Sequence, residues 1–349
     1  MNPSIRPNAA LRPLILLCVG VMLLLHAGKA HAQSCSATAP SVPFGSVDVV
    51  SGTNYSASAN ITVTCNMGLL SIGTINYSIC VGVPGASGST PRSMNSTVSY
   101  NLYGDSAHTN VWGTFGGTTG LPTPPNPVSL TTASLLLGGS ASTTVPIYGY
   151  LQSSQNSTVA AGSYSQTLTA TVNYNYTYSL LGTPGTPTSC ASTGGTTSGG
   201  TFPLIANATV INDCIVTATS INFGGSVGVL TSALNATGTV TAKCTTNDSY
   251  TIALNKGTTS GATIGNRLMA GSGSAVVQYQ LFTPTTISST GGSGCNYATV
   301  WGDASTGGST VGGTGTGTAQ NYTVCGQVQA QPTPAPNLYS DTITVTVTY

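Results

Sequence analysis

The sequence predicts an all-β protein made of two β-sandwich domains. Three observations lead to this prediction. Short stretches of alternating apolar and polar residues recur along the chain, separated by turns rich in glycine and asparagine. Threonine, valine and tyrosine, which favour pleated and half-buried surfaces, are abundant, whereas only 4% of the residues are charged. One set of landmarks occurs twice in the same order, which predicts two homologous domains.

Residues 1–32 are predicted to be a secretory signal peptide. Arg6 and Arg12 precede an apolar run over 14–25, and the small residues Ala30 and Ala32 follow it. The run is too short to span a bilayer comfortably, and no later stretch is apolar for long enough to form a transmembrane helix. We therefore expect a soluble, exported protein.

The cysteines also indicate an oxidising compartment. Eight of them follow residue 32, an even number that favours disulfides: Cys35, Cys65, Cys80, Cys190, Cys214, Cys244, Cys295 and Cys325. Cys35–Cys65 and Cys214–Cys244 are the natural bridges, and closing a loop of about thirty residues is worth roughly 3–4 kcal/mol in the chain-entropy model. Cys295–Cys325 is a third candidate, and Cys80 with Cys190 would pin the linker to the first domain. The sequence does not determine the connectivity.

The charge inventory argues against catalysis. After residue 32 the chain keeps four basic residues, six aspartates and no glutamate, and His108 is the one remaining histidine. So few ionisable groups hardly make an acid–base site, and no Ser-His-Asp set can be assembled around His108. We expect no enzyme, no metal or other cofactor and, without a basic face, no nucleic-acid partner.

The repeat defines the domain organisation. Cys35, Phe44 and Cys65 have the same spacing as Cys214, Phe223 and Cys244, and "YSQTLTATVNY" at 164–174 corresponds to "YSDTITVTVTY" at 339–349. The predicted domains are 33–180 and 201–349, joined by a Gly/Thr/Ser-rich linker over 181–200.

These landmarks resemble the spore coat protein U domain, the pilin-like module of archaic (Csu-type) chaperone–usher pili. The matching features are the Cys–Phe-Gly–Cys opening, the Arg-x-Met at Arg92 and Arg267, "YNLYGD" with "VWG", and the closing alternating segment. The resemblance implies two immunoglobulin-like, pilin-type sandwiches, the second lacking one strand. The two-domain size is similar to that of a pilus tip adhesin.

The resemblance also implies how such a domain is completed. A periplasmic chaperone, and then an adjacent pilin subunit at the outer-membrane usher, would add a strand beside the last one. The acceptor groove would be lined by the apolar positions of that strand, Ile343, Val345, Val347 and Tyr349. The alternative is an ordinary edge strand that is paired inside its own domain.

One segment before Cys214 is a candidate donor strand. Phe202, Leu204, Ala206, Ala208 and Val210 alternate there, whereas only Gln33 and Ser34 would precede Cys35 after signal cleavage. We expect 202–210 to complete the first domain from within the chain, which leaves the second open and the mature N-terminus without a strand to donate. Such a subunit would lie at the pilus tip, on the cell surface. Alternatively, 202–210 is the first strand of the second domain.

The first repeat carries two segments that the second lacks, 66–75 and the Pro- and Gly-rich 113–140, which is expected to be mostly loop. Their apolar residues are candidates for attachment to abiotic or host surfaces: Leu69, Leu70, Ile72, Leu121, Leu135, Leu136 and Leu137. The alternative is that they cap the open end of the core.

Two other functions remain open. A glycan-binding protein would use polar and aromatic groups such as Tyr100, Tyr103 and Trp112, and a structural coat or shaft subunit would need no ligand. Trp112 recurs as Trp301 and Arg92 recurs as Arg267, so packing for the tryptophans, and bonds to carbonyls or an aspartate for the arginines, are the simpler interpretations.

Overall fold

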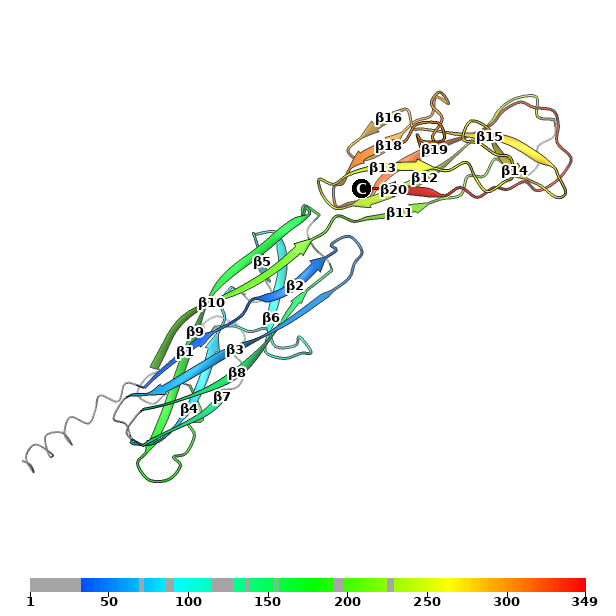
Figure 1. Cartoon of the computed structure of the whole chain (residues 1–349). Coiled ribbons are helices and arrows are strands. Elements are labelled where there is room, and N and C mark those ends of the chain that lie inside the picture. Colours follow the sequence, from blue (N-terminus) through cyan, green and yellow to red (C-terminus); the bar gives the residue numbers. More distant parts are fainter. Residues whose placement is uncertain are drawn as a thin grey trace, which may run out of the picture.

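The computed structural model describes residues 33–68, 72–85, 91–114, 128–135, 138–153, 155, 157–190, 197–224 and 229–349. The predicted signal peptide lies outside these residues. The described chain folds into two β-sandwiches that follow one another end to end (Figure 1). The prediction of an all-β protein with two sandwich domains is confirmed.

The first sandwich consists of two five-stranded sheets. One sheet has the order β1 (Ser34–Thr38), β3 (Tyr55–Met67), β8 (Gly139–Leu151), β6 (Val98–Tyr103) and β5 (Arg92–Met94). The other has the order β2 (Val42–Val47), β10 (Thr197–Val210), β9 (Gly162–Ser179), β4 (Ile72–Gly82) and β7 (Val128–Leu135).

The second sandwich repeats this plan with one sheet much reduced. Its larger sheet has the order β11 (Cys214–Ala218), β12 (Leu234–Cys244), β19 (Gln320–Val328), β15 (Val276–Phe282) and β14 (Arg267–Ala270), with β16 (Thr286–Ser288) and β17 (Gly291–Ser293) attached beside β19. The smaller sheet contains β18 (Val311–Thr314), β13 (Ser249–Leu254) and β20 (Val345–Thr348).

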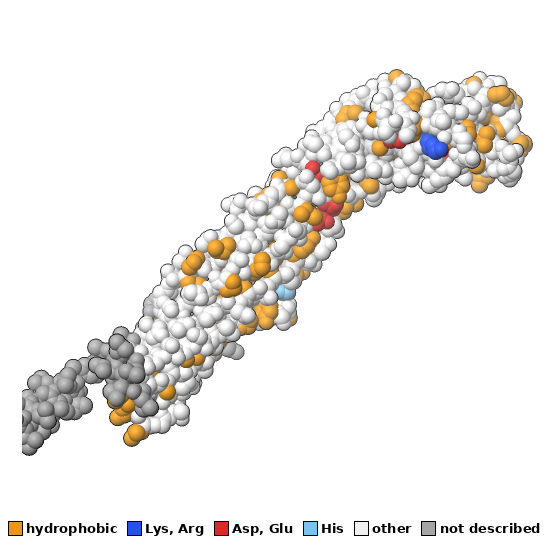
Figure 2. Space-filling model, in the orientation of Figure 1, with side chains coloured by type: hydrophobic (Ala, Val, Ile, Leu, Met, Phe, Trp, Pro, Cys, Tyr) orange, Lys and Arg blue, Asp and Glu red, His pale blue; other side chains and the backbone are white. Residues whose placement is uncertain are grey.

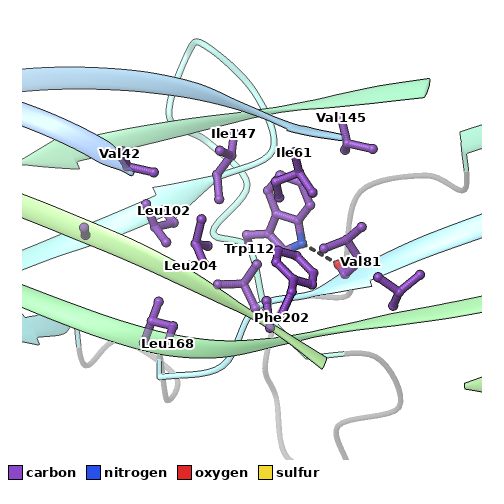
Figure 3. Packing of buried hydrophobic residues seen from close by; sticks show 14 of the residues in the cluster. Val42, Ile61, Val81, Leu102, Trp112, Val145, Ile147, Leu168, Phe202 and Leu204 are labelled. Carbon is purple, nitrogen blue, oxygen red and sulfur yellow. Dashed lines mark hydrogen bonds between the residues drawn. The ribbon is translucent and has the colours of Figure 1, made fainter. Parts of the chain in front are cut away.

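Alternation along the strands builds each core. In β3, Ile61, Val63 and Cys65 are fully buried while the residues between them face outward. Figure 3 shows this core around Trp112, whose indole Nε1 donates a hydrogen bond to the carbonyl of Val81 at 2.7 Å. Trp301 makes the same bond to Ile252 in the second sandwich at 2.9 Å, and both tryptophans are at most 1% exposed. The packing interpretation of the tryptophans is confirmed.

A buried arginine holds the carbonyls of several loops in each sandwich. Arg92 donates to the backbone oxygens of Pro84, Val83 and Trp112, and it is 1% exposed. In the second sandwich Arg267 donates to the backbone oxygens of Asn255 and Trp301. Of the two interpretations from the sequence, the bonds to carbonyls are therefore observed.

Four disulfides link strands and segments within the described residues of the two sandwiches. Cys35–Cys65 joins β1 to β3 in register, and Cys214–Cys244 joins β11 to β12 in the same way. Cys295–Cys325 attaches the segment after β17 to β19, and Cys80–Cys190 attaches the chain after β9 to β4.

Two expectations about segments need correction. Residues 113–140 were expected to be mostly loop, but residues 128–135 form β7, which pairs with β4 from Ile79–Val128 to Ile72–Leu135. Residues 197–210 form one strand, β10, although the predicted linker ran to 200 and the second domain began at 201. The sequence around β7 and the first residues of β10 are rich in glycine, and the pairing partners of both segments lie far away in the sequence, so propensity does not show where these strands begin.

The two sandwiches meet at residues 211–213, between β10 and β11. The amide of Ile211 donates to the carbonyl of Val47 at 3.0 Å, and Lys243 Nζ donates to the carbonyl of Val50 at 3.4 Å. Ala160 and Thr246 form an isolated parallel bridge across the same junction. Within the described residues, no helix has the length and apolar character needed to cross a bilayer.

Candidate strand-acceptor groove and apolar end

The two repeats differ most in the surroundings of their last strands. Strand β9 of the first sandwich is paired on both edges, to β4 on one side and to β10 on the other. Its inward side chains, which are those of the repeated segment, are all at most 5% exposed: Leu168, Ala170, Val172 and Tyr174. The first sandwich is therefore closed at this position.

Strand β10 provides this closure. It runs antiparallel to β9 from Thr197–Tyr174 to Val210–Gly162, and parallel to β2 from Ala206–Val42 to Val210–Val47. Its apolar face is at most 5% exposed, through Phe202, Leu204, Ala206, Ala208 and Val210. These side chains fill the space between the sheets, while Ile205, on the opposite face, is 39% exposed.

Among the described residues, no strand takes this place in the second sandwich. Of the strands that the structure describes, β20 pairs only with β13, from Leu254–Val345 to Thr251–Thr348. Ile343, Val345 and Val347 pack against the core but stay half-buried, and Tyr349 is 52% exposed. These four side chains correspond to the four buried side chains of β9. In the described part of the second sandwich, no strand covers this row of apolar side chains.

The opposite side of this space is uncovered as well. Val42 and Phe44 of β2 are 0% and 6% exposed, because β10 pairs beside them. Their counterparts Ile221 and Phe223 are half-buried, and the described residues around them form no strand. A Cβ at Gly149 would lie 2.7 Å from the ring of Phe44, and one at Gly326 would lie 2.9 Å from that of Phe223, so the two phenylalanines occupy equivalent places.

Together, β20 on one side and Ile221 with Phe223 on the other define the candidate acceptor groove. Its position between them matches that of β10 between β9 and β2. An unpaired strand edge beside a row of half-buried apolar side chains is the arrangement that accepts an added strand, since the backbone supplies hydrogen bonds and the row supplies pockets.

Polar contacts hold the acceptor strand in place. The hydroxyl of Tyr279 donates to Asp341 Oδ2 at 2.7 Å, and the amide of Thr258 donates to Asp341 Oδ1 at 3.0 Å. Tyr349 donates its hydroxyl to Asp213 Oδ1 at 3.0 Å, and this hydrogen bond raises the pKa of Tyr349. The chain around β20 is thus anchored before the strand by the bonds to Asp341 and after it by the bond from Tyr349 to Asp213, at the junction between the sandwiches.

A second exposed apolar region lies at the end of the first sandwich that is far from the second. There β4, β7 and β9 run past the core. We call the exposed side chains there the apolar end: Ile72, Tyr176, Tyr178, Leu180 and Leu181, with exposures of 39%, 37%, 41%, 60% and 88%. The hydroxyl of Tyr178 donates to the carbonyl of Ile72 at 2.5 Å, which links the two strands. Figure 2 shows apolar side chains at this end.

Aromatic contacts join the apolar end to the core. The ring centroids of Tyr77 and buried Tyr174 are 6.0 Å apart, and those of Tyr77 and exposed Tyr176 are 6.1 Å apart. Tyr176 and Tyr178 continue the inward face of β9, so they become exposed only where the facing sheet ends. These tyrosines and the leucines at 180 and 181 are not among the surface residues predicted from the sequence. The alternation that continues past Tyr174, where the repeated segment ends, was the available signal.

The proposed surface residues can be placed only in part. Ile72 belongs to the apolar end, and Leu135 is the last residue of β7, opposite Ile72 in the register. Leu69, Leu70, Leu121, Leu136 and Leu137 lie outside the described residues.

The aromatic residues considered for glycan binding are not accessible. Tyr100, Tyr103 and Trp112 are 2%, 8% and 1% exposed, so their faces cannot stack on a ligand. That choice of residues was wrong because alternation places Tyr100 in the core and because Trp112 folds back under Leu102, to whose carbonyl its amide donates at 2.8 Å. In the described part of the chain, no cluster of His, Cys, Asp or Glu side chains has the makings of a metal site.

No curated protein matches the chain. Three of the solved structures to which the chain is similar come from fimbrial adhesins. The chaperone–tip adhesin complex CsuC–CsuE from the archaic chaperone–usher Csu pili of Acinetobacter baumannii has a TM-score of 0.45 and 17% identity, over 90% of this chain and 100% of that one. The tip adhesin CupB6 of Pseudomonas aeruginosa has a TM-score of 0.32 and 11% identity, over 91% and 95%. A mutant of the CFA/I adhesin CfaE of enterotoxigenic E. coli has a TM-score of 0.25 and 9% identity, over 88% and 91%.

The family match covers both repeats. The Spore Coat Protein U domain matches residues 22–171 and again 200–346, which together make up most of the chain. The residues that carry the resemblance, from the paired cysteines to the last strand, lie within the described parts of both sandwiches. The chain therefore belongs to the Spore Coat Protein U domain family.

Proposed function

We propose that this protein is a fimbrial adhesin that is held in its fibre by its second sandwich and attaches to surfaces through its first. One observation carries the proposal. Two homologous sandwiches in one chain differ at one strand position, which β10 fills in the first and which no described strand fills beside β20 in the second. A chain that completes one unit and exposes an acceptor in the other is suited to join an assembly at one end only.

The groove would be occupied by strands from other proteins in turn. During export, after removal of residues 1–32, a periplasmic chaperone would cover Ile343, Val345, Val347 and Tyr349. At an outer-membrane usher, an adjacent pilin would replace the chaperone strand with its own. Because a bound strand gains backbone bonds along β20 and buries these half-exposed side chains, each complex would be held together without any covalent bond.

Attachment would reside at the apolar end. Leu180 and Leu181 are the most exposed of its side chains, and this end points away from the groove (Figure 1). Apolar side chains gain about 25 cal/mol for each Å2 that loses contact with water on a surface. Many fibres on one cell would multiply weak contacts into firm attachment to abiotic or host surfaces, which is the first step of a biofilm. The chemistry is physical adsorption, so the role requires no catalytic group and no cofactor.

The experiment uses fibre-bearing cells on polystyrene. One variant carries Leu180→Ser and Leu181→Ser, and another carries serine at Leu135, Leu136 and Leu137. A matched control carries Ile287→Ser, which removes a 50% exposed apolar side chain from the second sandwich. Electron microscopy verifies that fibres assemble in every strain.

We expect normal fibres with strongly reduced attachment for the variants of the first sandwich, and unchanged attachment for the control. Normal fibres with full attachment in both leucine variants would overturn the adhesive role of this end. Full attachment of cells that lack the chain but still make fibres would instead indicate a structural subunit.

A further inference from the structure

The junction between the two sandwiches is a close contact between their backbones. Lys243 Nζ of the second sandwich donates to the carbonyl of Val50 at 3.4 Å, and the hydroxyl of Thr246 donates to the carbonyl of Ser157. A Cβ on Gly317 would clash with the same carbonyl oxygen of Ser157, so only glycine fits there. Val50 is 3% exposed at this contact. The second sandwich is therefore docked directly on the first.

Strand β10 leaves the first sandwich at this contact. Val210, its last residue, pairs with Val47 of β2 on one side and with Gly162 of β9 on the other. Residues 211–213 follow, and the first strand of the second sandwich begins at Cys214 (Figure 1). The sandwich that follows a completing strand thus docks at the end where that strand leaves the sandwich it completes.

The acceptor groove has an equivalent exit in the second sandwich. Val229 corresponds to Val50, because each lies six residues after the phenylalanine of its repeat. Asn337 corresponds to Gly162, because each lies two residues before the tyrosine that begins the repeated closing segment. A strand that lies in the groove as β10 lies between β9 and β2 would therefore leave the second sandwich between Val229 and Asn337.

Exposed apolar side chains surround this exit. Leu338, next to Asn337, is 87% exposed and Val229 is 68% exposed, the two highest values among the large apolar side chains described in the second sandwich. Asn337 Nδ2 donates to Ser272 Oγ at 2.7 Å, in the hairpin that joins β14 to β15 at the end far from the first sandwich (Figure 1). Val276, which begins β15 after this hairpin, is 43% exposed. We call Val229, Val276 and Leu338 the exit face.

In the first sandwich the equivalent position is covered. Val50 is 3% exposed, whereas Val229 is 68% exposed. The carbonyl of Val50 accepts the bond from Lys243. The carbonyl of Val229 accepts a bond from the amide of Thr231 at 2.9 Å and keeps a second lone pair. The exit face therefore offers an apolar surface and a backbone acceptor to a second body.

The junction also defines the chemistry of a body that would fit. Lys243 directly precedes Cys244, the second cysteine of its sandwich, and Thr246 follows two residues after that cysteine. Both side chains donate to carbonyls of the first sandwich. A partner that docks in the same way would be another sandwich of this family. It would have a donor strand that ends shortly before its first cysteine, a cation before its second cysteine and a hydroxyl residue after it.

We propose that the exit face is the docking surface for the body of the next subunit of the fibre, a Spore Coat Protein U domain sandwich that follows its own donor strand. The proposal rests on the acceptor role proposed for the groove and adds a second contact to it. The body buries Leu338 and Val229 as Val50 is buried at the junction. The joint between the two subunits is therefore rigid, and it binds more tightly than a strand alone.

Photo-crosslinking in assembled fibres tests the proposal. The photoreactive residue p-benzoylphenylalanine replaces Leu338, Val229, Tyr349 or Ile287, one at a time. Tyr349 reports on the groove, and Ile287, which is 50% exposed on β16, is the matched control outside the exit face. Fibres are sheared from the cells before irradiation, so that periplasmic proteins are left behind, and the crosslinked peptides are identified by mass spectrometry.

We expect the probes at Leu338 and Val229 to join peptides beside the second cysteine of one neighbouring sandwich of this family. The probe at Tyr349 should join the segment before the first cysteine of the same neighbour, and the probe at Ile287 should join neither. Crosslinks from Tyr349 without any from the exit face would overturn the proposal and leave the role of the groove intact. Exit-face crosslinks to a second copy of this chain or to an unrelated protein would do the same. If none of the probes joined a neighbour, the proposed strand acceptance would fail as well.

A variant with both Val229→Asp and Leu338→Asp gives an independent measurement. Both side chains are exposed, so the purified variant should keep its melting temperature and should still be stabilised by a free peptide of residues 201–210 in the groove. The amount of this protein in sheared fibres should fall at least tenfold, because the new carboxylates would be buried against the docking body. Ile287→Asp is the control and should be incorporated normally. Normal incorporation of the double variant would contradict the docking role.

Discussion

Tyr174 and Tyr349 occupy the same position in the two repeats, but Tyr174 is 2% exposed whereas Tyr349 is 52% exposed. The hydroxyl of Tyr174 donates to the carbonyl of Gln33 at 2.7 Å, and that of Tyr349 donates to Asp213 Oδ1 at 3.0 Å. The sequence around the two tyrosines is similar, so the difference in burial comes from strand β10, which pairs beside Tyr174 and has no equivalent beside Tyr349 among the described residues. The different burial of these two tyrosines therefore reflects the closed strand position of the first sandwich and the uncovered one of the second.

A free donor strand should stabilise the second sandwich. The peptide of residues 201–210, added in excess, should pair with β20 and raise the melting temperature of that sandwich, because a ligand that binds only the folded state adds about 2.7 kcal/mol at a hundred times its dissociation constant. Trp301 fluorescence in a Trp112→Phe background reports the second sandwich. A control peptide with aspartate in place of Leu204 and Ala206 should have no effect, and equal shifts with both peptides would contradict a specific groove.

The apolar face of β10 should stabilise the first sandwich alone. Leu204 is fully buried, so Leu204→Ala should lower the free energy of unfolding of the first sandwich by about 2–5 kcal/mol. Ile205→Ala, one residue further along on the exposed face, should cost far less. Denaturant titration followed by Trp112 fluorescence, with Trp301→Phe as background, measures both variants. If Leu204→Ala destabilised the second sandwich instead, the assignment of β10 would be wrong.

Replacing the buried Arg267 by lysine should be strongly destabilising although the charge is kept. The guanidinium bridges Asn255, Trp301 and Gln280, and an ammonium cannot reach all three. Each lost hydrogen bond to a charged group costs about 1.5–3 kcal/mol, which denaturant unfolding of the second sandwich would detect. Lys256→Met, which changes an exposed cation, serves as the control and should leave the unfolding midpoint unchanged.

The protein should unfold in alkali. Burial raises the pKa of Tyr77 from 10.0 to about 12, and it raises the pKa values of Tyr100, Tyr250 and Tyr279 as well. A folded pKa above the unfolded value means that the stabilisation is complete below pH 10 and is lost as pH rises from about 10 toward the folded pKa.

Two buried arginines oppose this trend. Burial lowers the pKa of Arg92 to about 10 and also lowers that of Arg267, so their deprotonation favours the folded state over the same range. Four tyrosines outweigh two arginines, because each group changes the stability by at most about 1.4 kcal/mol per pH unit. Circular dichroism and tyrosinate absorbance, followed together during an alkaline titration, should show cooperative unfolding above pH 10, at a higher pH in Tyr77→Phe. Ionisation of all tyrosines without loss of structure would refute the argument.

Local patterns were sufficient to predict the class of fold. Alternation in segments such as 55–67 and 164–174 identifies strands with one buried face, and the repeated cysteine and phenylalanine spacing identifies two units of one family. For Arg92 the sequence left bonds to carbonyls and a bond to an aspartate both open, and the structure shows the bonds to carbonyls.

Other features had no signature in the sequence. Strand β7 lies in a Pro- and Gly-rich stretch and becomes a strand only through its pairing with β4. The tyrosines at 100 and 103 look like ligand-binding residues, but Tyr100 faces the core. Tyr103 lies on the other face of β6 and is covered by contacts with His108 and Tyr150. Tyr148 and Tyr150 alternate with apolar residues in β8 in a similar way, yet their side chains face outward.

The sequence by itself therefore determined the all-β class, the repeated unit and the family, because period, spacing and residue type are local properties of the chain. Only the tertiary structure decided that residues 197–210 pair in the first sandwich, that the matching place beside β20 is uncovered, and which tyrosines are accessible. The physical reason is that strand pairing and burial depend on contacts between segments far apart in the chain. An alternating segment carries the same pattern whichever sheet it joins.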